Sequence, residues 1–212
     1  MEESMISVNG VWKSFRRQIV LQDVNAVFEK GKIHGIVGRN GSGKTVLLKC
    51  ICGLLEPTRG EITVNGKIVG KDVDFPQEIG FIIDTPGFLK NYSGYKNLKY
   101  LASIRGKADD AAVRSFLSLV GLDPKDRKPV GKYSMGMRQR LGFAQALMEE
   151  PDILILDEPM NGLDRHGVED MHRLLKQLRE NGKTILLASH NRYDIDDLCD
   201  TVSEIDGGRL FL

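Results

Sequence analysis

Short apolar runs alternate with amphipathic segments along most of the chain. Apolar or alternating runs that predict strands lie at 6–11, 20–28, 32–37, 79–83, 153–156 and 184–188. Apolar residues at helical spacing lie at 43–55, 138–149 and 168–178. Strands that alternate with helices predict a mostly parallel sheet that is covered on both faces.

Two regions depart from this alternation. Residues 61–69 predict a hairpin, because Asn65 and Gly66 supply the positive φ angles that a tight turn needs. With the strands before residue 28, the hairpin predicts a small antiparallel β subdomain near the N-terminus. Residues 97–120 have helical spacing throughout, so we expect an inserted α-helical subdomain.

Composition and charge narrow the classes of protein. The 212 residues are 41% hydrophobic and 28% charged, which is ordinary for a globular domain. Lys and Arg number 30 and Asp and Glu 29, so no field favours nucleic acid or anionic lipid. The polar start, MEESMISVNG, is unlike a signal peptide, and no apolar run approaches the roughly 20 residues of a membrane span. We expect Cys50, Cys52 and Cys199 to be reduced and inert in a cytosolic compartment.

A phosphate-binding loop is predicted between the run at 32–37 and the following helix. Residues 38–45, GRNGSGKT, match G-x-x-x-x-G-K-[ST] at every fixed position. Glycines let the backbone curl so that its N–H groups face phosphates, Lys44 is expected at the β- and γ-phosphates, and Thr45 offers a hydroxyl to Mg²⁺. The alternative is a glycine turn with a solvated lysine. The candidate nucleotide-binding residues are Gly38, Asn40, Gly41, Ser42, Gly43, Lys44 and Thr45.

Charged and polar side chains follow two other buried strands. Asp157 and Glu158 come directly after 153–156, and His190 follows 184–188. Because α/β sheets place ligands at the carboxyl ends of their strands, we expect Asp157 to hold Mg²⁺, Glu158 to polarise an attacking water and His190 to contact the γ-phosphate. The alternatives are a solvated carboxylate pair and a structural histidine.

The motifs together resemble the ATP-binding cassette (ABC) ATPases. Residues 133–140, YSMGMRQR, resemble that family's signature motif, 161–164 its D-loop, and Ser189-His190 its switch histidine. The motifs occur in family order from Phe15 to the end of the chain. Residues 79–88 and 133–137 resemble the branch of bacterial exporters linked to bacitracin and lantibiotic resistance.

This resemblance implies ATP and Mg²⁺ as ligands and a P-loop NTPase core of residues 1–84 and 134–212 with a helical subdomain at 85–133. It implies that Phe15 stacks on adenine, that Ser134 and Gly136 contact the γ-phosphate held by a second copy, and that Asp164 bridges the dimer. It also implies that the helical subdomain docks on integral membrane subunits, which places the chain in the cytoplasm at the inner face of the plasma membrane.

The sequence departs from the family pattern at two places. Asp84 stands where the family usually has Gln; it is a candidate for the Mg²⁺ site, and the alternative is that it only caps the loop before Pro86. Met135 and Met137 replace a Gly and the Gln of the signature motif, which removes a polar side chain near the ribose.

The function we expect is that of the ATP-binding and ATP-hydrolysing subunit of a bacterial ABC exporter. The alternative is a soluble ABC ATPase acting on nucleic acid or ribosomes. The near-zero net charge and the single cassette argue against it, and no nucleic-acid partner is expected. A nucleotide-binding regulator without turnover is a third class, and Glu158 and His190 argue against that one.

Overall fold

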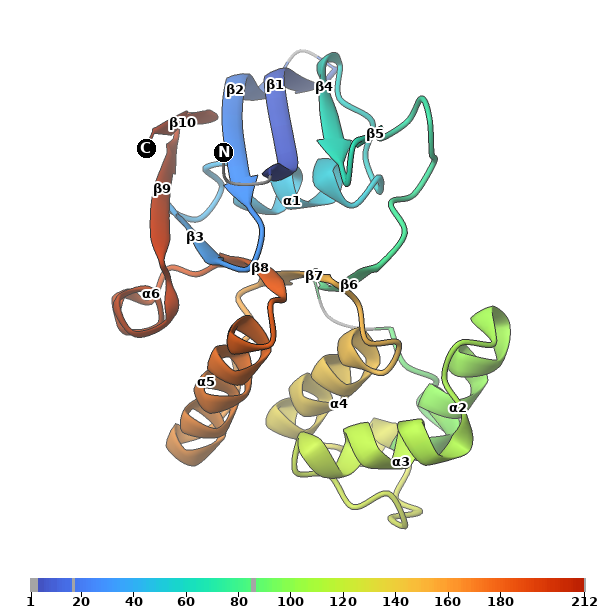
Figure 1. The fold of residues 1–212 in the computed structure, drawn as a ribbon. Coiled ribbons are helices and arrows are strands. Elements are labelled where there is room, and N and C mark those ends of the chain that lie inside the picture. The colour runs from blue at the N-terminus through green and yellow to red at the C-terminus, as the bar shows by residue number, and fades with distance from the viewer. Residues whose placement is uncertain (1–3, 17, 85–86, 212) are drawn as a thin grey trace.

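The computed structural model describes residues 4–16, 18–84 and 87–211. Its N-terminal strands form an antiparallel sheet in the order β2-β1-β4-β5 (Figure 1). The strands are β1 (Ser4–Phe15), β2 (Gln18–Glu29), β4 (Arg59–Val64) and β5 (Lys67–Ile68). The hairpin predicted at 61–69 joins the last two, and Asn65 and Gly66 take positive φ at its turn. The predicted antiparallel β region is therefore confirmed.

The second sheet carries the predicted parallel strands. Its order is β10-β9-β3-β8-β7-β6; β9, β3, β8, β7 and β6 run parallel to one another, and β10 pairs antiparallel with β9. The strands are β3 (Ile33–Val37), β6 (Ile79–Ile82), β7 (Ile153–Asp157), β8 (Thr184–Ala188), β9 (Thr201–Asp206) and β10 (Arg209–Phe211). The apolar pattern did not predict β9 and β10, because exposed and buried residues alternate only briefly there.

Helix α1 (Lys44–Ile51) lies between the two sheets. Its side chains at Leu47 and Leu48 are fully buried in one core cluster with residues of both sheets. The helix ends earlier than the predicted residue 55, because Gly53 takes φ +76° and starts a turn. The predicted phosphate loop therefore leads into a helix that packs against both sheets.

The helical subdomain consists of α2 (Gly94–Arg105), α3 (Asp110–Leu119) and a 3-10 turn, η1 (Val130–Lys132). Its start, at residues 85 and 86, lies outside the described residues. Helix α4 (Met135–Leu147) joins it to the core, since Leu98, Leu117 and Leu141 share one buried cluster with the parallel sheet. In Figure 1 these helices lie at the opposite end of the molecule from the antiparallel sheet.

The remaining helices are α5 (Arg165–Glu180) and α6 (Arg192–Leu198). Helix α4 begins one turn before the predicted residue 138, because Ser134 accepts a hydrogen bond from the Met137 N–H and caps the helix. Among the described residues, no helix is long and apolar enough to span a membrane.

The three cysteines are free thiols. Burial raises the pKa of Cys50 to about 11 and that of Cys199 to about 12, and the pKa of Cys52 is also raised. Thiols with such pKa values stay protonated near neutral pH and are poor nucleophiles. A catalytic role for these cysteines is therefore not supported.

Candidate functional site

The phosphate loop connects β3 to α1 through glycines that other residues could not replace. Gly38, Gly41 and Gly43 have φ angles of +155°, +80° and +116°, which L side chains rarely adopt. A Cβ added to Gly38 would lie 2.3 Å from the Ile205 carbonyl oxygen of β9. The glycines thus let the loop curl without steric strain, and Gly38 is tightly enclosed, as a backbone cradle for an anion requires.

Lys44 lies across the loop. Its Nζ donates to the carbonyl oxygens of Gly38 at 2.6 Å and Arg39 at 3.2 Å. Helix α1 has no side chain capping its N-terminus, although each of the other five α-helices among the described residues has one. Its first N–H groups are therefore left for a ligand, and the positive end of the helix dipole favours an anion there.

Thr45 and Asp157 bring the predicted Mg²⁺ ligands together. Thr45 Oγ1 donates to Asp157 Oδ2 at 2.5 Å, across 112 residues of sequence. Burial raises the pKa of Asp157, and the negative charges of Glu158 and Asp84 raise it further. A divalent cation would relieve this excess of negative charge. Hydroxyl and carboxylate oxygens are the ligands that Mg²⁺ prefers, so these residues fit it.

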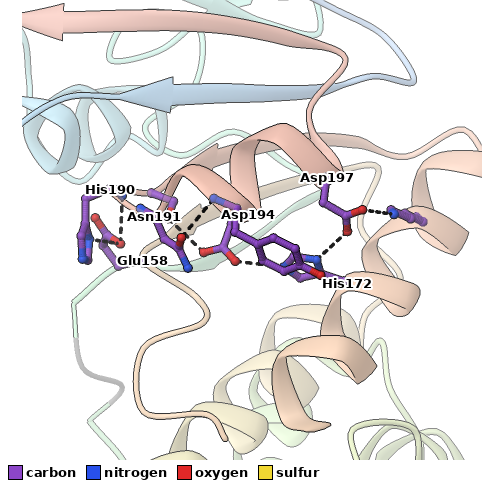
Figure 2. A network of polar contacts seen from close by, with 9 residues as sticks. Glu158, His172, His190, Asn191, Asp194 and Asp197 are labelled. Atoms are coloured by element: carbon purple, nitrogen blue, oxygen red, sulfur yellow. Dashed lines mark hydrogen bonds and ion pairs between the residues drawn. The ribbon is translucent and has the colours of Figure 1, made fainter. Parts of the chain in front are cut away.

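Glu158 and His190 form a second pair beside Asp157. His190 Nδ1 lies 2.8 Å from Glu158 Oε2, and the His190 backbone N–H donates weakly to the same oxygen at 3.4 Å (Figure 2). Glu158 has φ +49°, a strained value for a side chain of its size. The carboxylate points toward the end of β8, where His190 lies.

Three side-chain oxygens are buried without a hydrogen-bond partner in the described part of the chain: Ser42 Oγ, Asp157 Oδ1 and Glu158 Oε1. All three belong to the predicted nucleotide site. Leaving a polar group buried and unpaired costs about 1–3 kcal/mol, so such groups usually indicate a missing ion, water or ligand. Here each oxygen corresponds to a predicted contact with phosphate, Mg²⁺ or the attacking water.

Asp84 lies just after β6, next to the strand that ends in Asp157. Its carboxylate is ion-paired with Lys49 Nζ of α1 at 2.5 Å and is well exposed. No hydrogen bond or ion pair among the described residues joins Asp84 to Thr45 or Asp157. Its negative charge nevertheless helps to raise the pKa of Asp157. Pro86, which the capping alternative involves, is outside the described residues.

Phe15 ends β1, and the residue is 44% exposed, which leaves it accessible for stacking. Lys13 Nζ lies 5.2 Å from the ring centroid. At this exposure Phe15 is not a buried core residue, so that alternative is wrong. Stacking on adenine remains a prediction.

The signature residues lie apart from the phosphate loop. Ser134 caps α4 and Asp164 caps α5, and both line one surface hollow with Gly136. A Cβ on Gly136 would lie 2.9 Å from the Gly162 carbonyl oxygen, so the signature motif packs directly on the D-loop. None of residues 38–45 lines this hollow. Within one chain, therefore, the two halves of the predicted ATP contacts do not meet.

No role for His172 was predicted from the sequence. The structure buries it against α6, the helix that follows His190. It lies on α5 between Asp194 and Asp197 of α6, two residues that follow the switch histidine (Figure 2). The signal available in the sequence was the i, i+3 spacing of these aspartates, which places both on one face of a short helix. Nothing in the sequence indicated that their partner lies on α5.

Comparison with known proteins agrees with these features. The family model described as ABC transporter matches residues 21–161. The chain is 44% identical over 206 residues to the uncharacterized ABC transporter ATP-binding protein YybJ of Bacillus subtilis (strain 168), covering 97% of this chain and 94% of the relative. It is 40% identical over 210 residues to the bacitracin transport ATP-binding protein BcrA of Enterococcus faecalis, covering 98% of this chain and 68% of that one.

A further relative is the lantibiotic transport ATP-binding protein SrtF of Streptococcus pyogenes, 34% identical over 209 residues, with coverage of 98% and 90%. A solved structure described as the ATP binding subunit of an ABC transporter has a TM-score of 0.87 at 26% identity, covering 98% of this chain and 88% of that one. The dimeric cassette MJ0796 also has a TM-score of 0.87, at 23% identity, covering 97% and 96%, and supports the fold alone.

The family resemblance and the fold predicted from the sequence are thus confirmed, including the likeness to bacitracin and lantibiotic transport proteins. The motifs of the phosphate loop, the Asp157-Glu158 pair and His190 meet at one edge of the parallel sheet, as ATP hydrolysis requires. The chain therefore belongs to the ABC transporter family, in which it is an ATP-binding and ATP-hydrolysing subunit.

Proposed function

We propose that this chain powers a bacterial exporter by hydrolysing ATP between two copies of itself. The observation that carries the proposal is the set of three unpaired buried oxygens around the phosphate loop, at Ser42, Asp157 and Glu158. They correspond to the contacts that ATP, Mg²⁺ and the attacking water need. The direction of transport is inferred from the relatives named for bacitracin and lantibiotic transport.

Each residue has a distinct part in the proposed reaction. Backbone N–H groups of 38–45 and the uncapped start of α1 hold the β- and γ-phosphates, and Lys44 turns from its two carbonyl contacts to neutralise their charge. Glu158 Oε1 accepts a hydrogen bond from the attacking water, while Oε2 holds His190. In its imidazolium form, His190 donates from Nδ1 to Glu158 and from Nε2 to a γ-phosphate oxygen as charge develops there.

Thr45 and Asp157 would hold Mg²⁺, and Asp84 is proposed as a more distant contributor to the same site. A bound Mg²⁺ supplies positive charge that stabilises the transferring phosphoryl group. The raised pKa of Asp157 is consistent with this assignment: burial is its main cause and the charges of Glu158 and Asp84 add to it, and a bound cation would stabilise the ionised carboxylate. The exposed ring of Phe15 is proposed to stack on adenine.

The helical subdomain, 85–133, is proposed to dock on integral membrane subunits. A surface hollow lined by Phe81, Tyr100, Leu101 and Gln145 lies between β6, α2 and α4, and the exposed apolar side chains nearby include Ile104. Apolar side chains gathered around an open hollow favour a protein partner. This docking would place the chain at the cytoplasmic face of the plasma membrane.

Two copies are proposed to close head to tail over two ATP molecules. Within one chain, the hollow lined by Ser134, Gly136 and Asp164 is separate from the phosphate loop, so a second copy would be needed to complete each site. The alternative, a soluble ABC ATPase acting on nucleic acid, gains no support from the named relatives.

The replacement Glu158→Gln tests the proposal. It keeps the size of the side chain and removes the carboxylate that accepts from water, so we expect turnover to fall roughly 10²-fold or more while ATP binding persists. The ATP-bound variant should accumulate as a dimer in size-exclusion chromatography. Glu180→Gln, at the exposed end of α5, is the matched control and should hydrolyse ATP normally. Turnover of Glu158→Gln within about threefold of wild type would refute the role of Glu158.

A further inference from the structure

A buried histidine links α5 to the segment that carries His190. His172 lies between two carboxylates of α6: its Nδ1 is 2.7 Å from Asp197 Oδ2, and its Nε2 is 3.0 Å from Asp194 Oδ1. His172 is 4% exposed and Asp194 1% exposed, so the inner pair is shielded from water. The Tyr193 ring stacks on the imidazole, with centroids 5.4 Å apart.

This geometry selects one protonation state of His172. A carboxylate only accepts hydrogen bonds, and a neutral imidazole donates from one nitrogen alone. With carboxylate oxygens at both ring nitrogens, only the imidazolium ion can donate to both. A neutral His172 would leave one nitrogen lone pair facing a carboxylate oxygen, and in the case of Asp194 the carboxylate would be a buried charge without its cation.

The same carboxylate continues the network toward the nucleotide site. The second oxygen of Asp194 accepts from Ser189 Oγ at 3.1 Å, and Ser189 Oγ accepts from the Asn191 N–H at 3.1 Å. These two contacts fix the backbone on both sides of His190, whose imidazole meets Glu158. In Figure 2, Asp194 lies between His172 on one side and Asn191, His190 and Glu158 on the other.

We propose that His172 is a positioning residue for ATP hydrolysis: its imidazolium form fixes Asp194, and through Ser189 it fixes the 189–191 turn that aims His190. The inference rests on the proposed function, because it assumes that His190 acts on the γ-phosphate. It adds a residue 18 positions before His190 in the sequence, on a different helix, that sets the geometry of the switch. Turnover should then depend on the charge of His172.

The charges around His172 support this dependence. Burial lowers its pKa, but the hydrogen bonds to Asp194 and Asp197 outweigh burial, so the pKa of His172 is raised above its ordinary value of 6.5. The groups that face it from α6 are Asp194, Asp197 and the Tyr193 ring; on α5, Lys176 binds the far side of Asp197 at 2.8 Å. Lys176 and His172 both lower the pKa of Asp197.

The sign of the pH effect follows from the raised pKa. At a pH below 6.5 the imidazolium is present and the network is complete. As pH rises through the pKa of folded His172, the second hydrogen bond is lost and the 189–191 turn loosens. ATP turnover should therefore decline on the alkaline side, with kcat falling and KM for ATP nearly unchanged, since the phosphate loop is not involved.

Kinetics of matched variants test the inference in the full-length chain. His172→Gln should lower kcat roughly tenfold and abolish the alkaline decline, because glutamine carries no charge at any pH. His172→Arg should retain turnover into the alkaline range, since a guanidinium donates to both carboxylates without titrating. His166→Gln, on the exposed side of α5, is the control and should match wild type. A wild-type kcat and pH profile in His172→Gln would overturn the proposal.

A second variant separates His172 from His190 as the source of the decline. Asp197 contacts His172 but not His190, so Asp197→Asn should lower the pKa of His172 and move the alkaline decline to lower pH, by roughly one pH unit. This test does not depend on whether His172→Arg folds. A decline that stays in place in Asp197→Asn would belong to another group and would overturn the proposal.

An NMR titration gives a readout without turnover. We expect the ring resonances of His172, assigned by their absence in His172→Gln, to titrate above 6.5, and the His190 backbone amide to shift with the same midpoint. If wild type hydrolyses ATP but the His190 amide does not shift as His172 titrates, the positioning role of His172 is refuted and the proposed function stands. If the amide follows His172 but ATP is not hydrolysed, the proposed function fails and the structural coupling stands.

Discussion

At the scale of single residues, two strained backbone positions lie at the nucleotide site and carry charged side chains. Glu158 and Asp84 follow neighbouring parallel strands and have φ angles of +49° and +58°. Such conformations cost about 1–3 kcal/mol each and persist where surrounding contacts impose them. Glu158 is held by His190 and Asp84 by Lys49, so each strained residue has one charged or polar partner.

The replacement Asp84→Asn should raise the Mg²⁺ concentration for half-maximal ATPase about threefold. The reason is the loss of one negative charge near Asp157, in a position exposed enough that the interaction is worth about 0–1 kcal/mol. Asp84→Gln, the residue usual in the family, should keep substantial activity. Separate titrations of Mg²⁺ and ATP measure the effect.

Lys49→Gln is the matched control, because it frees the Asp84 carboxylate and should lower the Mg²⁺ requirement. Two other results are informative. Tighter ATP binding by both neutral Asp84 variants would mean that Asp84 acts mainly by repelling the γ-phosphate. Superimposable Mg²⁺ and ATP curves would show that Asp84 serves only its local ion pair and loop.

At the scale of elements, α4 joins the helical subdomain, the signature motif and the parallel sheet. It lies so close to β6 that a Cβ on Gly80 would be 2.0 Å from the Ala146 carbonyl oxygen. Arg140 of α4 also donates to the Val120 carbonyl oxygen and to Asp170 of α5, at 2.7 Å and 3.2 Å. We therefore expect a change in the distance between β6 and α4 to displace the whole helical subdomain.

Gly80→Ala should destabilise the fold by roughly 1–3 kcal/mol, because its new methyl group meets backbone that cannot move without shifting α4. Gly87→Ala is the matched control, since its Cβ would meet nothing within 4 Å, and it should change stability by no more than about 0.5 kcal/mol. Urea unfolding measures both. Equal stabilities for the two variants would contradict the close β6–α4 contact.

At the scale of the whole molecule, one chain carries the two proposed sets of ATP contacts on separate surfaces. The phosphate loop with Lys44 lies on one, and the hollow with Ser134 and Asp164 lies on the other. If each ATP needs one surface from each copy, the active species is a dimer and its concentration limits the rate.

ATPase activity per chain should therefore rise with protein concentration in the dilute range. Mixing a Lys44→Ala chain with a Ser134→Arg chain should restore activity that neither has alone, because one heterodimer interface joins an intact phosphate loop to an intact signature motif. Steady-state rates across dilution and mixing ratio test this. A rate per chain that stays constant at every dilution, with no recovery on mixing, would argue for hydrolysis by single chains.

Much of this protein was determined by local sequence. The phosphate loop, the strand that ends in Asp157 and Glu158, and the glycines at turns follow from residue chemistry over a few positions, and the structure places them as predicted. Apolar periodicity likewise predicted the parallel core and the helical insertion, because burying one face of a strand or helix imposes a period that can be read directly.

Other features depended on tertiary structure. The need for glycine at 38 arises partly from Ile205 of β9, a strand too briefly patterned to predict. The pairing of Asp84 with Lys49, and of His172 with Asp194 and Asp197, joins helices and loops that are distant in sequence. A side chain's charge state is set by whatever the fold packs against it, so the role of His172 became visible only when α5 and α6 were brought together.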